Sequence, residues 1–286
     1  MRINAYAKIN IGLDVLRRRS DGYHEVRMIM QSIGIHDELD IERSSGSGIR
    51  INTDRQNLPV NEDNLVYKAA RLIMDEYGVK GGLNVNLSKN IPVAAGLAGG
   101  STDAAATLVA VNELYGLGLD KEELRRLGVR IGADVPFCIM QGTVLSEGIG
   151  EILTPLKPCP WCRILLAKPP IGVSTAYVYT HLKLDEVTHP DIDGIISGIE
   201  KGDLYGIADN MGNVLESVTI PANPVVGDIK DIMRENGAFS VLMSGSGPSV
   251  FGMFDNEDDF ERAYRSLDGS GLVNELFKTC TFDPNA

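Results

Sequence analysis

Positive charge is scarce in this 286-residue sequence, which has 27 lysine and arginine residues against 39 aspartate and glutamate residues, for a formal net charge of −12. A surface that binds nucleic acid normally presents a stripe of basic side chains to the phosphates. The acidic balance therefore argues against a nucleic-acid partner. A phosphate-bearing ligand would have to be attracted locally, by backbone amides, a helix N-terminus, a few cations or a metal ion.

Long hydrophobic runs are also missing. The longest uncharged small or apolar run lies near 104–111, far short of the roughly 20 residues that a membrane-spanning helix needs. Arg2 and Lys8 interrupt the N-terminus where a signal peptide requires an unbroken apolar core. We therefore expect a cytoplasmic protein with no membrane partner.

Cysteine is rare: the sequence has only Cys138, Cys159, Cys162 and Cys280. Cys159 and Cys162 form a C-x-x-C pair, but a reactive dithiol is usually held at a helix N-terminus, whereas this pair follows several prolines and leads into the strand-like 163–168. The other cysteines and the histidines lie at no spacing typical of a zinc site. The pattern favours a plain turn between domains over redox or metal chemistry.

The length exceeds the usual 100 to 200 residues of one domain by a wide margin, which predicts two domains. A proline-rich segment, 154–162, is the best boundary, and we expect one domain at 1–155 and a second at 156–286. The strand and helix patterns indicate an α+β protein, or a two-layer α/β one.

Hydrophobic periodicity gives the expected elements. In the first half we expect strands at 3–16, 25–35, 37–43 and 82–89, and helices at 61–78, after the glycine-rich stretch that ends near 103, and at 120–132. In the second half we expect strands at 163–169, 239–245, 249–254 and near 276, and helices at 176–183, 192–200, 204–215, 225–235 and 258–267.

A glycine-rich stretch, 91–103 ("IPVAAGLAGGSTD"), leads into a helix. Glycines let successive amides point at an anion, and the first N–H groups of a helix are unpaired. The hydroxyls of Ser101 and Thr102 can cap the helix or bind phosphate oxygens and Mg²⁺. The spacing fits neither the P-loop nor the dinucleotide fingerprint. Composition alone leaves open a phosphate loop and a simple turn.

A second glycine segment, 243–248 ("MSGSGP"), lies between two strand-like runs and by itself favours a β-hairpin turn. Taken with "AYAKINIGL" at 5–13, the 91–103 loop and "GADVPF" at 132–137, however, the sequence resembles the GHMP kinases over essentially its whole length. The resemblance implies a two-domain GHMP kinase fold, with an N-terminal domain like that of ribosomal protein S5. It also implies ATP and Mg²⁺ as cofactors, an N-terminal domain at 1–155 that binds ATP and has the catalytic residues, and a domain at 156–286 that contributes to the substrate site.

Within the family, "DGYHE" at 21–25, "EDNL" at 62–65 and "SEGIGEIL" at 146–153 resemble the members that act in non-mevalonate isoprenoid biosynthesis. These phosphorylate the 2-hydroxyl of a small molecule, cytidine diphosphate methylerythritol (4-diphosphocytidyl-2-C-methyl-D-erythritol). Thr102 stands where the family more often has a second serine, and it keeps the hydroxyl.

The resemblance implies catalytic roles for two residues. Asp134 matches the aspartate that deprotonates or orients the attacking hydroxyl, and Lys8 matches the lysine that holds this aspartate ionised and stabilises charge near the transferring phosphoryl group. The residues alone also permit Asp134 to terminate a helix before Pro136, and Lys8 to be a solvated strand residue.

The resemblance also implies binding residues. Those expected at ATP are Asn64, Lys89, Pro92, Gly96, Leu97, Ala98, Gly99, Gly100, Ser101 and Thr102. Those expected at the substrate are Asn10, Tyr23, His24, Tyr179, Ser244 and Gly245, with Tyr177 as the alternative to Tyr179 as a stacking platform for cytosine. The metal ligands stay unassigned.

Two other functions are compatible with these residues. One is a GHMP kinase for a different alcohol, such as homoserine or mevalonate, which "DGYHE" disfavours. The other is a non-catalytic nucleotide-binding regulator on the same fold, which the presence of Lys8 and Asp134 disfavours.

Overall fold

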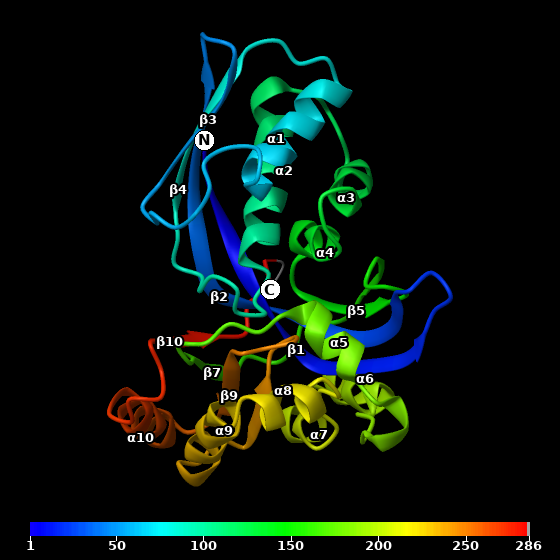
Figure 1. The fold of residues 1–286 in the computed structure, drawn as a ribbon, viewed down its shortest axis with the longest axis vertical. Helices are drawn as coiled ribbons and strands as arrows, with labels where there is room; N and C mark the ends of the chain where they lie inside the picture. The colour runs from blue at the N-terminus through cyan, green and yellow to red at the C-terminus, as the bar shows by residue number, and fades with distance from the viewer. Residues whose placement is uncertain (285–286) are drawn as a thin grey trace. The chain divides into compact units, whose positions relative to one another are not determined.

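The computed structural model describes residues 1–284, and its chain forms two compact units. The first unit comprises residues 1–7, 35–93 and 98–141, and the second comprises 8–34, 94–97 and the chain from 142 onward. Two long strands, β1 (Arg2–Arg18) and β2 (His24–Ser44), contribute residues to both units (Figure 1). The functional division of the sequence near residue 155 stays a prediction.

The first unit has a sheet on one side and helices on the other (Figure 1). Strand β4 (Gly82–Ser88) pairs antiparallel with the second part of β2 and parallel with β3 (Gly48–Thr53). The helices are α1 (Leu65–Glu76), α2 (Gly99–Tyr115), α3 (Lys121–Val129) and α4 (Val135–Met140). Since β3 and β4 are parallel, a crossover must join them, and α1 supplies it.

Helix packing in this unit follows the sequence pattern. The buried residues of α1 recur at helical spacing and are Val66, Ala69, Ala70, Ile73 and Met74. In α2 the consecutive alanines 104–106 are buried, and their small side chains let the helix approach its neighbours closely. These two helices lie against each other in the first unit.

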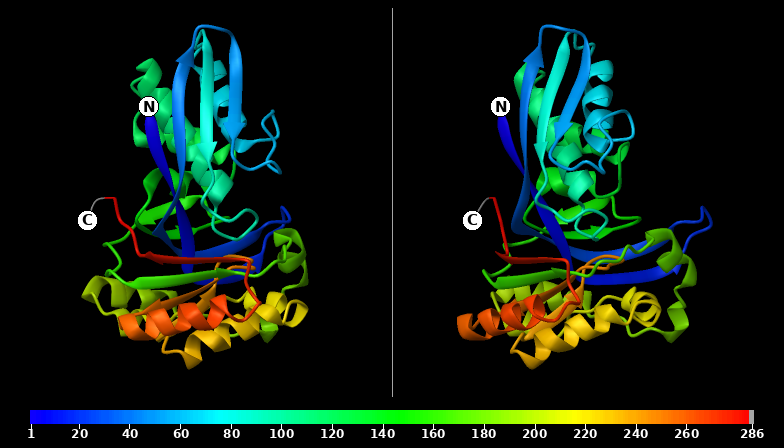
Figure 2. Two further views of the ribbon diagram at one scale, coloured as in Figure 1. Left: turned by 90° about the vertical axis from the view of Figure 1, so that its left-hand side faces the viewer. Right: turned by 60° about the vertical axis from the view of Figure 1, so that its left-hand side comes forward.

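The second unit contains an antiparallel four-stranded sheet in the order β10 (Glu275–Cys280), β7 (Arg163–Lys168), β9 (Val250–Phe254), β8 (Ser240–Met243). Its central strands are buried, and the helices α8 (Glu216–Ala222), α9 (Val225–Glu235) and α10 (Glu257–Asp268) lie along one face (Figure 2). The remaining helical elements are α5 (Thr175–His181), the 3₁₀ turn η1 (Leu184–Glu186), α6 (Ile192–Lys201) and α7 (Leu204–Ala208).

A hairpin of β5 (Thr143–Glu147) and β6 (Ile152–Pro155) extends the pairing of the first part of β2, with Met28–Gln31 opposite Thr143–Ser146. The sequence patterns did not predict β3, β5, β6, α4 or α8. They also divided β2 into two strands, 25–35 and 37–43, where the structure has one.

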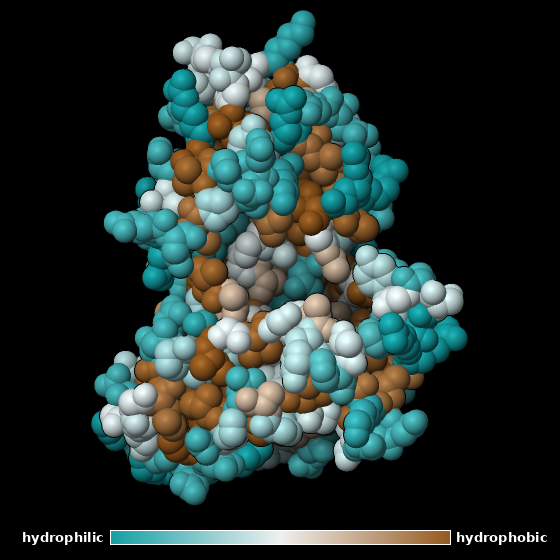
Figure 3. All heavy atoms as spheres, viewed as in Figure 1, coloured by the Kyte–Doolittle hydropathy of each residue, from teal (hydrophilic) through white to brown (hydrophobic). Residues whose placement is uncertain are grey.

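The helix expected at 204–215 was too long, since α7 ends at Ala208. Strand β1 uses the backbone that would have continued it: Leu13 N donates to Gly212 O, and Val214 N donates to Leu13 O. Tertiary pairing thus overrides a helical pattern here. Over residues 1–284, no helix is long and apolar enough to cross a bilayer, and the face seen in Figure 3 mixes polar and apolar residues.

Candidate active site

The two glycine segments meet in the second unit. Ser244 Oγ donates to Gly96 O at 3.0 Å, although the two residues are 148 positions apart. Gly96 has a φ of +74°, and a Cβ added there would lie 2.3 Å from Ser244 O, while Gly245 has a φ of +58°. Glycine is needed at Gly96 both for its backbone conformation and for the close approach of Ser244. The structure therefore brings together two segments that the sequence only predicted to share a site.

Lys8 lies beside the first of these segments. Its side chain is buried, and Nζ donates to Asn10 Oδ1 at 2.8 Å and to Gly96 O at 3.1 Å. Its backbone N donates to Leu97 O. Among the described residues of its own unit, no carboxylate forms an ion pair with Lys8. Because a buried ammonium without a counter-charge is costly, this position favours the arrival of an anion.

Aromatic rings expected at the substrate also come together in the second unit. The rings of His24 and Tyr179 have centroids 5.2 Å apart and are tilted by 42°. Tyr23 is exposed, and Tyr177 stacks on His181 instead. This geometry favours Tyr179 over Tyr177, although its contact with substrate stays a prediction. Burial, and then the charge of Arg18, lower the pKa of His24, which keeps the ring neutral near pH 7.

The N-terminus of α2 lies in the first unit. Its cap is Ala98, a non-glycine residue in the left-handed conformation with φ +58°, and no side chain caps the helix. Thr102 Oγ1 donates to Tyr6 O at 2.8 Å, so of the two alternatives for this hydroxyl, the one in which it caps the helix was wrong. The first intrahelical bond runs from Thr102 N to Ala98 O, which leaves the amides of residues 99–101 without helical partners. Such amides are the groups that bind phosphate.

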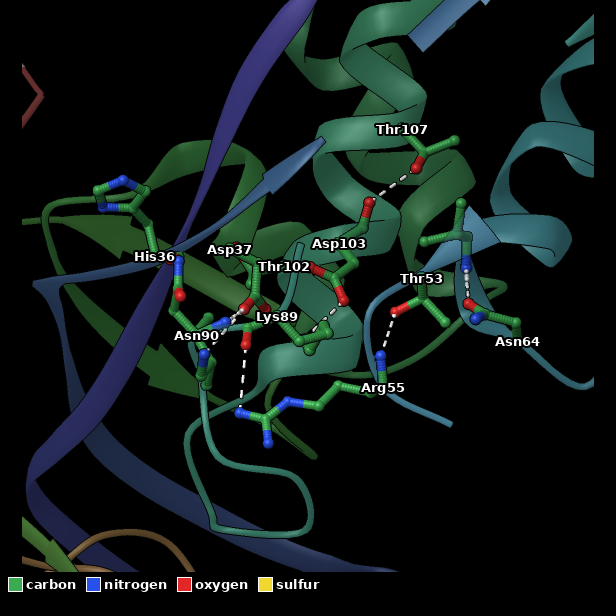
Figure 4. A network of polar contacts seen from close by, with 12 residues as sticks. His36, Asp37, Thr53, Arg55, Asn64, Lys89, Asn90, Thr102, Asp103 and Thr107 are labelled. Atoms are coloured by element: carbon green, nitrogen blue, oxygen red, sulfur yellow. Dashed lines mark hydrogen bonds and ion pairs between the residues drawn. The ribbon is translucent and has the colours of Figure 1, made fainter. Parts of the chain in front are cut away.

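Lys89 is the centre of a buried ion network in the same unit (Figure 4). Its Nζ pairs with Asp37 and, at 2.8 Å, with Asp103 Oδ2. The other oxygen of Asp37 accepts from Asn90 N at 2.6 Å and Ile91 N at 2.8 Å. The network therefore ties the residues that enter the glycine loop to the helix that follows it.

Two carboxylates share one ammonium in this network. Burial is the main cause that raises the pKa of Asp103, to about 8, and the nearby Asp37 charge adds to it while Lys89 opposes it. The oxygen Oδ1 of Asp103 is buried without a hydrogen-bond partner. For Lys89, burial opposes protonation, but Asp103 and Asp37 together raise its pKa. The ammonium of Lys89 is thus already paired with Asp37 and Asp103. Its expected contact with ATP stays a prediction.

Sequence reasoning missed Asp37. A signal was present, because Asp37 alternates with Ile35 and Leu39 on one face of a strand, and all three side chains are buried. A carboxylate in such a position requires partners. Nothing in the local pattern says that those partners are Lys89 and the amides of the loop.

Asn64, expected at ATP, caps α1. Its Oδ1 accepts from Val66 N at 2.9 Å, and its Nδ2 donates to Pro59 O at 2.7 Å. We expect Asn64→Ala to lower the free energy of unfolding by about 1 kcal/mol, as for other lost N-caps. Urea denaturation measures this, with Asn61→Ala as the control, since Asn61 serves only an exposed turn. Equal stability of Asn64→Ala and wild type would contradict the capping role.

Asp134 occupies the N-cap position of α4, but its side chain makes no capping hydrogen bond. The alternative that Asp134 ends a helix before Pro136 was wrong, because α4 begins at Val135. Asp134 is half-buried, and its carboxylate makes no capping hydrogen bond to the helix that it precedes. The catalytic role of Asp134 and its proximity to Lys8 stay predictions.

Cys159 and Cys162 are buried and are not joined by a disulfide. Burial raises the pKa of each thiol to about 12. A thiol so rarely ionised is a poor nucleophile, which supports the prediction of a plain turn over redox chemistry.

Comparison with known proteins finds the family description "GHMP kinases N terminal domain" at residues 64–142 and "GHMP kinases C terminal" at 195–272. A curated 4-diphosphocytidyl-2-C-methyl-D-erythritol kinase of Lachnospira eligens is 52% identical over 99% of both chains. One of Clostridium perfringens is 47% identical, covering 100% of this chain and 99% of the relative.

Solved structures agree with these relatives. A crystal structure of 4-(cytidine 5'-diphospho)-2C-methyl-D-erythritol kinase superposes with a TM-score of 0.85 at 32% identity, covering 99% of this chain and 100% of that one. A homoserine kinase from Cytophaga hutchinsonii, at 20% identity and a TM-score of 0.75, covers 98% and 94% of the two chains and shares the fold. The expected α+β, two-domain fold is confirmed.

Proposed function

The chain belongs to the GHMP kinases, and on that premise we propose that it transfers the γ-phosphoryl group of ATP to the 2-hydroxyl of 4-diphosphocytidyl-2-C-methyl-D-erythritol, in isoprenoid precursor biosynthesis. The observation that carries the proposal is the 52% identity, over 99% of both chains, to a curated kinase for this substrate. A second relative at 47% identity and a solved structure at 32% identity have names of the same meaning.

On the ATP side, the amides of residues 99–101 and the preceding loop bind phosphate oxygens, as the unpaired N-terminus of α2 allows. The ammonium of Lys8 stabilises negative charge on the transferring phosphoryl group. Its burial and the lack of a carboxylate partner among the described residues of its unit support this role.

At the acceptor, Asp134 accepts the proton of the attacking hydroxyl, for which a carboxylate not engaged in helix capping is suited. His24 and Tyr179 hold the cytosine by stacking and by hydrogen bonds from a neutral imidazole. The substrate contact expected of Tyr23, which is exposed, stays a prediction. Asn10, Ser244 and Gly245 line the loop beside Lys8 and orient the acceptor.

Magnesium belongs to the proposal through the chemistry of ATP. Among residues 1–284 no group of three His, Cys, Asp or Glu side chains is arranged to hold a metal ion. This fits Mg²⁺, which keeps several waters and is often held by substrate phosphates with only one or two protein groups. The Ser101 hydroxyl, in the first turn of α2, is the group that we expect to reach it. Bound there, Mg²⁺ would neutralise charge on the phosphates. A cytoplasmic location stays a prediction.

The test is ADP formation from Mg-ATP by the purified chain with 4-diphosphocytidyl-2-C-methyl-D-erythritol, homoserine or mevalonate as acceptor. We expect turnover with the first and none above background with the others. Turnover only with another alcohol would replace the substrate. ATP binding by the folded chain without turnover on any acceptor would favour the regulatory alternative.

A further inference from the structure

Three consecutive arginines, residues 17–19, end strand β1 at a hairpin that leads into β2. Arg19 N donates to Tyr23 O at 2.8 Å, and Gly22 N donates to Arg19 O at 3.2 Å. Gly22 has a φ of +89°, as expected for a three-residue hairpin loop that ends in a left-handed glycine. These bonds place Arg19 opposite Tyr23.

The hairpin register fixes which side chains share a face. With Arg19 opposite Tyr23, Arg18 lies opposite His24, and Arg17 lies opposite Glu25. Opposed residues of antiparallel strands point to the same face, and successive residues point to opposite faces. The ion pair of Arg17 with Glu25 agrees with this register. Arg18 therefore lies on the same face as His24.

His24 in turn is the residue whose ring meets Tyr179. Arg18 thus stands at the edge of the aromatic pair that we propose to hold cytosine. The effect of its charge on the pKa of His24 is consistent with this closeness.

The three arginines differ in whether a carboxylate forms an ion pair with them. Arg17 pairs with Glu25, and Arg19 pairs with Asp21 at 2.8 Å. No residue in the described part of the second unit forms an ion pair with Arg18. In a chain with a net charge of −12, this guanidinium is a local cation whose charge no neighbouring carboxylate neutralises.

We propose that Arg18 binds the diphosphate of the substrate beside the cytosine platform of His24 and Tyr179, and thereby selects a nucleoside diphosphate over the bare nucleoside. The inference rests on the proposed function, because it takes the cytidine diphosphate substrate from there. Guanidinium groups suit this ligand, since they donate two parallel hydrogen bonds to phosphate oxygens.

Arg18→Gln tests the inference, with Arg17→Gln as the matched control on the opposite face. Calorimetry with cytidine diphosphate and with cytidine needs no turnover and therefore does not depend on the kinase assay. We expect Arg18→Gln to weaken the binding of cytidine diphosphate by about tenfold or more, because a charge-assisted hydrogen bond is lost. The affinity for cytidine should change by no more than about twofold. Arg17→Gln should change neither affinity by more than about twofold.

Kinetics gives a second readout. In Arg18→Gln, the KM for 4-diphosphocytidyl-2-C-methyl-D-erythritol should rise by about tenfold, with the KM for ATP and kcat nearly unchanged.

Equal weakening of the binding of cytidine and of cytidine diphosphate would mean that Arg18 only supports the hairpin, and would overturn the proposal. Unchanged affinity for both ligands would overturn it as well. If Arg18→Gln fails to fold, Arg18→Lys replaces it, because lysine keeps the positive charge but lacks the two parallel N–H donors of the guanidinium. Arg18→Lys should weaken the binding of cytidine diphosphate by a smaller factor and leave the affinity for cytidine unchanged. A wild type that binds cytidine diphosphate but phosphorylates no acceptor would contradict the proposed function instead.

Discussion

Asp134→Asn is expected to lower kcat at least about a hundredfold, within the range for loss of a general base. Asparagine keeps the shape of the side chain but cannot accept the proton of the attacking hydroxyl. Because Asp134 makes no capping hydrogen bond to α4, the substitution should leave the free energy of unfolding within about 0.5 kcal/mol of wild type. Steady-state ADP formation and urea denaturation measure the two effects separately.

The matched control is Asp120→Ala. Asp120 caps α3, and it accepts from Glu123 N at 2.8 Å in a capping box. Its loss should lower the free energy of unfolding by about 1 kcal/mol and leave kcat nearly unchanged. The opposite responses of these two aspartates, both at N-cap positions but only Asp120 with a capping hydrogen bond, would separate catalysis from stability. Turnover that survives Asp134→Asn would keep the kinase and remove Asp134 as the base.

Lys89→Met is expected to lower the free energy of unfolding by about 3 to 5 kcal/mol, because it leaves Asp37 and Asp103 buried without their shared cation. Lys157→Met is the control, since the pair of Lys157 with Glu200 is exposed and should contribute at most about 1 kcal/mol. Urea denaturation at pH 7 measures both variants. Equal, small losses would show that the network does not stabilise the first unit.

The same network predicts a dependence of stability on pH. Asp103 has its pKa raised to about 8 from an ordinary value of 3.8. The folded chain therefore binds more protons at this residue than the unfolded chain between these pH values, so its contribution is fully present below pH 3.8 and is lost as the pH rises through 8. We expect the stability of Asp103→Asn relative to wild type to increase between pH 5 and pH 8.5. A constant difference between the two proteins would contradict this.

The sequence predicted most helices because the spacing of their apolar residues and the residues at their ends all lie within one short segment of the chain. Helix α9 has the predicted bounds, Val225–Glu235, since its buried face repeats at helical spacing between Pro224 and Asn236. Residues 209–215 show the limit, because β1 binds their backbone from a distant part of the sequence. A helical pattern contains no information about such a partner.

In the candidate site, too, the sequence predicted the local features and missed the contacts between distant segments. The composition of 91–103 predicted a loop before a helix, and the helix is there, but α2 begins at Gly99, inside the stretch that was expected to be loop. That Gly96 contacts Ser244, and that the amides after Lys89 bind Asp37, depends on strands brought together by folding. The roles of Lys8 and Asp134 came from family resemblance, because neither spacing nor periodicity distinguishes a catalytic carboxylate from a surface one.

The most direct measurement of the central claim is the ³¹P NMR spectrum of the product that the wild type forms from Mg-ATP and 4-diphosphocytidyl-2-C-methyl-D-erythritol. The account predicts ADP and one new phosphate monoester on the tertiary 2-hydroxyl, with the substrate's diphosphate intact. A diphosphate that is cleaved, a phosphate on another hydroxyl, or ATP left unchanged in the presence of folded protein would contradict it.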